Sequence, residues 1–127
     1  TPMAKEASHW FADKLPFKMK TPTFKDQRVS LLGGRLSRIQ RGPRKTSIPA
    51  AHLIYSVGAH KLSVLVFDGD DMNEVQAVGH NLGSERPFEV HEVRDHRVAF
   101  YRRGGLTYAV TSKLPKKQLV ELLGTSL

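Results

Sequence analysis

Histidines are the first residues in this 127-residue chain whose chemistry suggests a site. His91 and His96 lie close together in the sequence, and folding could bring His52, His60 and His80 beside them. Neutral imidazole nitrogens are good ligands for zinc, nickel or copper. A metal, however, needs three or four donors that converge within about 2.0–2.3 Å, and the chain has no HxxxH or HExxH pair. A histidine-based metal-sensing domain is therefore an alternative, and our prediction is that no metal or cofactor is bound.

Arginines and lysines form three groups along the chain, and Tyr101 and Tyr108 lie near one of them. If the groups share one face of the fold, they would attract phosphates, and the tyrosine rings could stack on bases. A basic nucleic-acid-binding module is thus a second alternative. We favour the simpler interpretation, a solvated cationic rim around a sheet with the tyrosines in the core or at its edge. The groups are Arg35, Arg38, Arg41, Arg44 and Lys45; Arg94, Arg97, Arg102 and Arg103; and Lys113, Lys116 and Lys117.

Familiar catalytic motifs are missing from the sequence. The acidic run 68–71 has the composition of a calcium loop, but Gly79 stands where such a loop needs its glutamate. The pair Gly33-Gly34 is not followed by the lysine and hydroxyl residue of a phosphate-binding loop. There is no Gly-x-Ser-x-Gly elbow, and the chain contains no cysteine, which excludes disulfides, thiolate metal sites and cysteine nucleophiles. We predict that the protein is not an enzyme.

The elements that would position polar side chains are mostly strands. Residues 98–114 predict a hairpin, because apolar and aromatic residues lead into and out of Gly104-Gly105, a pair that adopts positive φ without steric cost. A short helix follows after Pro115. For binding of a ligand or partner we select the residues in or beside this hairpin that combine polar chemistry with a well-defined turn. They are His91, His96, Tyr101, Arg102, Arg103 and Tyr108.

Further strands are predicted upstream of this hairpin. The strand over 28–40 contains Gly33-Gly34, which should bend it, bulge it or let another backbone approach. Residues 50–57 and 61–67 form a second hairpin, and the latter strand is apolar on both faces, which predicts a central position with a helix over one side. Residues 88–93 alternate as a strand, with Phe88 and Val90 inward. Between the strands at 61–67 and 88–93 we expect a short helix capped by Asp71, or an ordered loop.

The N-terminal part predicts a helix over 5–15 and an extended connector over 18–24. Ser8 could cap this helix, with Trp10, Phe11 and Leu15 on one side and Pro16 ending it. The expected fold class is α+β: a mostly antiparallel sheet of five to six strands, built from a meander and hairpins, with short N-terminal and C-terminal helices packed on it. Residues 1–127 make one domain.

Composition narrows the partners and the compartment only slightly. The formal charge of +8 and pI near 10.1 favour an anionic surface nearby. No apolar run approaches the roughly 18 residues of a spanning helix. The start of the chain does not resemble a signal peptide. Because Thr1-Pro2 is an unusual natural start, we expect a longer protein that carries its targeting signals elsewhere.

Three segments together resemble the extracytoplasmic domain of the transmembrane anti-sigma factors of bacteria. They are GGRLSRI (33–39), AAHLIYSVGAHKLSVLVF (50–67) and YRRGGLTYAVTSKLPKKQLVELL (101–123). They cover about two thirds of the chain, and their motifs are structural rather than catalytic. In that family a tryptophan often follows the tyrosine of the GLTY sequence, whereas this chain has Ala109, and residues 68–97 match no part of the family pattern.

The resemblance implies a regulatory role in transcription and signal transduction. The chain would be a sensor or regulatory domain on the periplasmic side of the bacterial inner membrane, in a single-pass membrane protein. A cytosolic part outside this sequence, typically with a histidine and cysteine zinc-finger motif, would hold an extracytoplasmic-function sigma factor away from RNA polymerase. The implied partners of this domain are a regulatory protein or a small signal, and it could also form a homodimer.

Overall fold

The computed structural model describes residues 2–41, 46–68 and 89–124. Four expectations lie outside these ranges: the place of Arg44 and Lys45 in the first basic group, the short helix or loop that follows residue 68, the placement of His80 beside other histidines, and the inward orientation of Phe88. The described elements follow the expected order of helix, three strands, three strands and helix. They are α1 (Pro2–Ala12), β1 (Val29–Arg41), β2 (Thr46–Val57), β3 (His60–Phe67), β4 (Glu89–Val93), β5 (His96–Arg103), β6 (Leu106–Ser112) and α3 (Lys116–Gly124).

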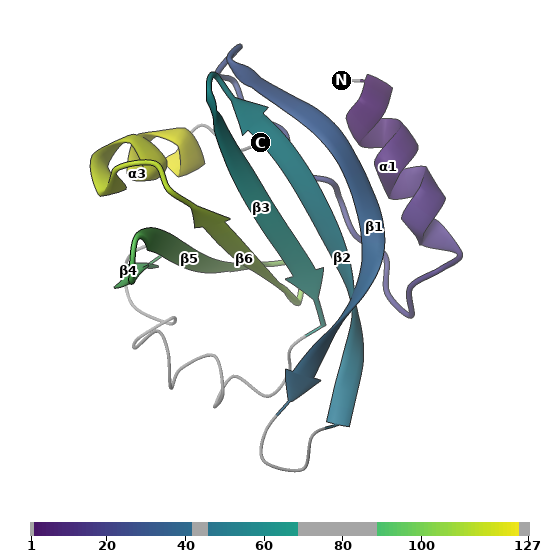
Figure 1. Ribbon diagram of the computed structural model, residues 1–127. Helices are drawn as coiled ribbons and strands as arrows, with labels where there is room; N and C mark the ends of the chain where they lie inside the picture. Colours follow the sequence, from purple (N-terminus) through teal and green to yellow (C-terminus); the bar gives the residue numbers. More distant parts are fainter. Residues whose placement is uncertain (1, 42–45, 69–88, 125–127) are drawn as a thin grey trace.

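The six strands form one sheet in the order β1-β2-β3-β6-β5-β4, and every neighbouring pair is antiparallel. Two meanders are therefore joined side by side through β3 and β6, as Figure 1 shows. This arrangement confirms the predicted α+β class. It also confirms the central position of β3, which has alternating apolar side chains on both of its faces.

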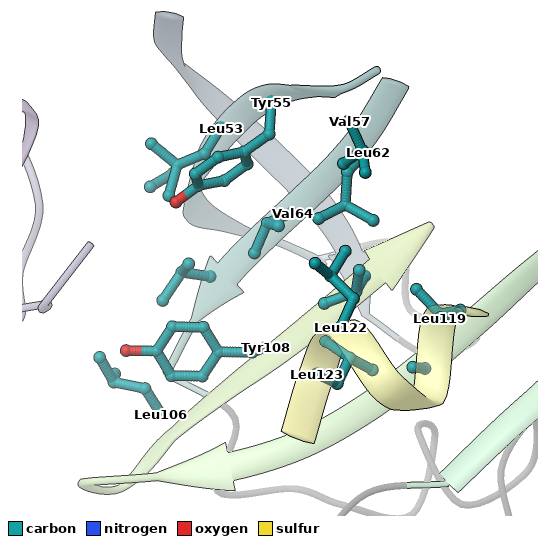
Figure 2. Close-up of a cluster of buried hydrophobic side chains, with 14 of the residues drawn as sticks. Leu53, Tyr55, Val57, Leu62, Val64, Leu106, Tyr108, Leu119, Leu122 and Leu123 are labelled. Carbon is teal, nitrogen blue, oxygen red and sulfur yellow. The ribbon is translucent and has the colours of Figure 1, made fainter. Parts of the chain in front are cut away.

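Both helices pack on the same face of the sheet, which we call the helix-bearing face. Its core contains the side chains of Leu53, Val64 and Val110 from three adjacent strands, together with Phe11 of α1. Three leucines of α3 join the same cluster at its other end, and Figure 2 shows them beside the β3 side chains. They are Leu119, Leu122 and Leu123.

The opposite face carries a smaller apolar cluster, to which neither α1 nor α3 contributes a residue. It consists of Ala50, Phe67, Phe100 and Ala109. Because side chains alternate along a strand, the residues between these positions point to the helix-bearing face. The strand register thus assigns every described residue of the sheet to one of two surfaces.

The N-terminal helix differs from its predicted form in three respects. It begins at Pro2, a residue favoured in the first turn because its missing N–H would have no helical partner there. Ser8 therefore lies inside the helix and does not cap it. Trp10 is 44% exposed, so it does not enter the core, whereas Phe11 and Leu15 are both buried in the main core cluster as expected. The helix ends at Ala12, before Pro16, because the next turn closes on the Phe11 carbonyl through the amides of Lys14 and Leu15.

The connector between α1 and β1 is extended as predicted, and side chains from distant strands hold it. The Tyr55 hydroxyl donates to the Pro22 carbonyl at 2.6 Å, and the Tyr108 hydroxyl donates to the Lys20 carbonyl at 3.2 Å. On the α1 side, the Thr21 amide donates to the Ser8 hydroxyl oxygen at 2.9 Å. The connector is therefore tied to α1, β2 and β6 across the helix-bearing face.

Of the alternatives expected for the glycine pair in β1, a bend, a bulge or the approach of another backbone, the structure shows the bulge. The β1–β2 register shifts between Leu31 and Gly33, which is a bulge. A Cβ on Gly34 would lie 3.2 Å from the ring of Phe11 and 3.1 Å from Leu53. The close approach that requires glycine thus comes from a side chain of α1 rather than from another backbone. No described helix is long and apolar enough to cross a membrane.

Candidate functional site

The six residues selected from the sequence do not form one cluster, because they alternate between the two faces of the sheet. Tyr101 pairs with Tyr108 and Arg103 with Leu106, and these residues belong to the helix-bearing face. The register assigns the other three, His91, His96 and Arg102, to the opposite face. The six residues were chosen because they are close together in the sequence. Side chains of successive strand residues point to alternate faces of the sheet, and this alternation separates them.

Tyr101 and Tyr108 form a stacked pair on the helix-bearing face. Their ring centroids are 4.8 Å apart and the rings are inclined by 4°. Tyr108 is only 3% exposed, and burial raises the pKa of its hydroxyl. Because one face of its ring is occupied by Tyr101 and its hydroxyl holds Lys20, Tyr108 presents no surface on which a base could stack. This placement agrees with the simpler interpretation of the tyrosines as core residues.

Arg102 supports the hairpin turn. Its guanidinium donates to the Gly105 carbonyl at 2.9 Å, and Gly104 and Gly105 have φ of 61° and 80°. Arg103 is exposed on the other face. The same alternation places Arg35 and Arg38 of β1 on different faces, so the basic groups of the sequence do not share one surface.

His91 and His96 lie on the same face but in different surroundings. His91 is half-buried, with its ring 6.5 Å from that of Phe100. His96 Nδ1 lies 2.8 Å from Asp95 Oδ1, and Lys113 Nζ lies 3.7 Å from Asp95 Oδ2. Hydrogen bonding to its own backbone amide, and the neighbouring His96, lower the pKa of the Asp95 carboxyl. Within the described residues no group of three His, Asp or Glu side chains could hold a metal ion.

The opposite face instead has a groove near the β2–β3 turn, which we call the polar groove although Ile54, Ala59 and Leu62 also line it. It has a volume of about 480 Å³. The pairing of β3 with β6 ends at Leu62 and Ser112, and Lys61 and Lys113 are the next residues beyond that pair. Two lysine ammonium groups therefore lie at the end of the sheet near the β2–β3 turn. Such a set of donors can bind a carboxylate or a phosphate through charge-assisted hydrogen bonds. Its polar lining side chains are His52, His60, Lys61, Ser63, His96, Thr111 and Lys113.

A chain of hydrogen bonds crosses three strands beside this groove. Arg35 Nε donates to His52 Nδ1 at 3.2 Å, and His52 Nε2 lies 2.6 Å from the Ser63 hydroxyl oxygen. Because the arginine can only donate, Nδ1 is the acceptor, and the neutral ring carries its proton on Nε2. Burial, and then the charge of Arg35, lower the pKa of His52.

This pair of histidine and serine lacks the arrangement that activates a serine nucleophile. A histidine that activates a serine must accept the hydroxyl proton, and a carboxylate usually orients it from the other nitrogen. Here His52 donates toward Ser63, and a guanidinium occupies the carboxylate's place. No local pattern in the sequence signals this chain of bonds, since its three members belong to three different strands.

The lowered pKa of His52 should be measurable by NMR titration of its ring protons. In the folded state we expect a value below the ordinary 6.5. The unfolded chain then binds a proton more readily than the folded one, so this residue costs stability as pH falls through about 6.5. Arg35→Gln should raise the pKa of His52 without fully restoring it, because burial remains. Arg38→Gln is the matched control, since Arg38 bonds Ser47 instead. A pKa of 6.5 or above in the unmodified protein would contradict the prediction.

Comparison with known proteins gives limited similarity. No family model matches the chain, and no curated protein matches it. Among solved structures, the crystal structure of MucB in complex with MucA(peri) is similar with a TM-score of 0.47 and 13% identity. The match covers 84% of this chain and 35% of that chain, so the chain spans about a third of the length of that structure. No residue role is transferred at this level of similarity.

Proposed function

We propose that this chain is a non-enzymatic regulatory domain on the periplasmic side of a membrane-anchored anti-sigma factor. The observation that carries the proposal is where the three family-like segments lie in the fold. GGRLSRI belongs to β1, the second segment makes β2 and β3, and the third makes the end of β5, all of β6 and most of α3. Because β1, β2, β3 and β6 are consecutive in the sheet, segments far apart in the sequence form one continuous scaffold.

In this role the domain would recognise a partner or signal and pass the result across the membrane. The polar groove on the opposite face offers lysine, histidine and hydroxyl groups to an anionic group of a regulatory protein or a small signal. The connector on the helix-bearing face is tied down by Tyr55 and Tyr108. A change in these contacts, or proteolysis of the domain, would release the sigma factor that the cytosolic part holds. A homodimer is compatible with this scheme.

The two alternatives find less support in the described residues. A nucleic-acid-binding surface needs its cations on one side, and β1 and β5 distribute theirs over both faces. A metal-sensing role needs converging donors. His52, His60 and His96 line one groove, but no three His, Asp or Glu side chains of the described residues are placed to hold an ion. Affinity for DNA or RNA that persists at physiological salt, or a thermal shift with zinc, nickel or copper, would favour one of these alternatives.

The experiment uses the complete protein that contains this domain, in its bacterial host. Alkaline phosphatase fused after Leu127 is expected to be active, because its disulfides form only outside the cytosol. A reporter of the cognate extracytoplasmic-function sigma factor should stay repressed by the intact protein. It should lose its response to the inducing signal when this domain is replaced by an unrelated folded domain. An inactive fusion, or an unchanged response after replacement, would contradict the proposal.

A further inference from the structure

The outer edge of β1 is a second surface with the properties of a binding site. In the sheet of the described residues, β1 is a terminal strand. Its 13 residues pair with β2 on one side only. A terminal strand presents unpaired backbone N–H and C=O groups, which another extended chain can bind. The bulge near Gly33 interrupts this edge at one point and leaves a long regular part after it.

An apolar groove lies between this edge and α1, which runs beside β1 in Figure 1. Its volume is about 440 Å³. Gly34 contributes no side chain to it, and the ring of Phe11 packs so closely that it would lie 3.2 Å from a Cβ at this position. The groove therefore has a shallow floor and an aromatic wall. Its lining residues are Glu6, Ala7, Trp10, Phe11, Leu31, Gly33 and Gly34.

Exposed apolar side chains are found in this groove, at Trp10, and along β1 itself, at Leu32 and Leu36. Trp10 is 44%, Leu32 53% and Leu36 46% exposed, and among the described residues only Val93 and Val120 are comparable. Val93 lies on β4 at the far edge of the sheet, and Val120 lies on α3. Three large apolar side chains beside one free strand edge resemble a partner surface more than scattered exposure.

The charged side chains near the groove indicate the net charge of the segment that would bind there. Arg35 projects from β1 on the opposite face of the sheet and Arg38 on the helix-bearing face, where Lys5 of α1 is also exposed. Lys14, which follows α1, is paired with Asp13 at 3.4 Å. Glu6 is the one acid among the lining residues. Pairing of β1 with β1 of a second copy would bring two arginine-bearing edges together in a chain of net charge +8, and like charges on adjacent strands are destabilising. An acidic partner is attracted by the same charges.

We propose that β1 binds an extended acidic segment of a partner protein as an additional strand, with the apolar side chains of that segment in the α1–β1 groove. Backbone hydrogen bonds to the edge supply affinity, and alternate side chains supply specificity. Because side chains alternate along a strand, the glutamate or aspartate side chains of the segment lie on the opposite face of the sheet, where Arg35 of β1 projects. This inference needs only the geometry of the edge and does not rest on the proposed function.

The probe is a synthetic peptide, acetyl-Glu-Val-Glu-Val-Glu-Val-Glu-amide, and the readout is the fluorescence of Trp10, the only tryptophan of the chain. Binding should shift this emission to shorter wavelength and move the amide signals of residues 29–41 in NMR spectra. A peptide with proline in place of its central valine should bind at least about tenfold more weakly, because proline lacks a donor and breaks the added strand. A peptide with lysine for glutamate should not bind.

Two variants at exposed apolar positions locate the site. Leu32→Glu should weaken peptide binding about tenfold, because it removes apolar contact and repels the peptide. Val93→Glu is the matched control at the other edge of the sheet, and it should leave binding unchanged. Circular dichroism shows whether both variants fold.

The proposal is overturned by equal binding of the proline peptide, by equal effects of the two variants, or by no binding at millimolar peptide. NMR shifts confined to the polar groove of the opposite face would also overturn it. So would concentration-dependent dimerisation that Leu32→Glu abolishes, since the occupant would then be a second copy. None of these outcomes bears on where the domain lies in the cell, so the proposed function is tested separately.

Discussion

Phe11→Ala is expected to lower the free energy of unfolding by about 3–5 kcal/mol, the usual cost of removing a buried aromatic ring. Phe11 is 1% exposed, belongs to the main core cluster and fits against Gly34 of β1. It is the residue of α1 that reaches deepest into the sheet, so its loss leaves a cavity and removes the main attachment of the helix. Urea denaturation followed by circular dichroism measures the change.

Trp10→Ala is the matched control, since it removes an adjacent and larger aromatic side chain from the same helix. Trp10 is 44% exposed. It contacts Phe11 edge to face at 4.8 Å, and Lys14 Nζ lies 4.4 Å from its ring centre. Because such contacts contribute about 1 kcal/mol, the control should cost about that amount. Equal losses for the two variants, or a larger loss for Trp10→Ala, would show that α1 is attached differently.

The contrast between Trp10 and Phe11 also shows where sequence reasoning reached its limit. Adjacent residues on a helix point about 100° apart, so one apolar stripe can include both only at its margins. Which of them enters the core depends on the space above Gly34, and that space is formed by β1 and β2. The sequence could predict a helix and an apolar side for it. It could not predict which ring a distant glycine would accommodate.

The strands were more predictable than the helix because their signals are local. Alternating apolar residues and glycine turns predicted β2, β3, β5 and β6 and the hairpins that join them. The glycine pair in β1 likewise marked a bulge and a close approach. The pairing of β3 with β6 had no local signal, since the two strands are far apart in the sequence.

The candidate site was less predictable than the fold for a related reason. Residues that are adjacent in the sequence, such as Arg102 and Arg103, lie on opposite faces of the sheet because side chains alternate along a strand. Residues far apart, such as Arg35, His52 and Ser63, are brought together by strand register. Sequence proximity therefore selected side chains that the sheet separates, and it could not find the chain of hydrogen bonds that crosses three strands.

Tyr55→Phe is expected to lower the free energy of unfolding by about 1–3 kcal/mol, although it removes a single oxygen atom. The Tyr55 hydroxyl donates to the Pro22 carbonyl at 2.6 Å in a buried setting, and Tyr55 is 2% exposed. Without this donor the Pro22 carbonyl stays buried and unsatisfied, which costs more than the hydrogen bond itself contributes. The edge contact of the ring with Phe24 at 5.5 Å is kept, so the variant isolates the hydrogen bond.

Tyr108→Phe makes the same change at the other tyrosine that holds the connector. Its bond to the Lys20 carbonyl is longer, 3.2 Å, and only partly buried, so water can replace the lost donor and the cost should be about 1 kcal/mol or less. Limited digestion with trypsin gives a second readout, because Lys18 and Lys20 are exposed in the connector. Cleavage there should be faster in Tyr55→Phe than in Tyr108→Phe. The loss of the stronger hydrogen bond lowers the free energy of local opening of the connector more. If both variants kept normal stability and protease resistance, the tyrosines would not be what holds the connector, and α1 would have to be fixed to the sheet through Phe11 and the Ser8–Thr21 contacts alone.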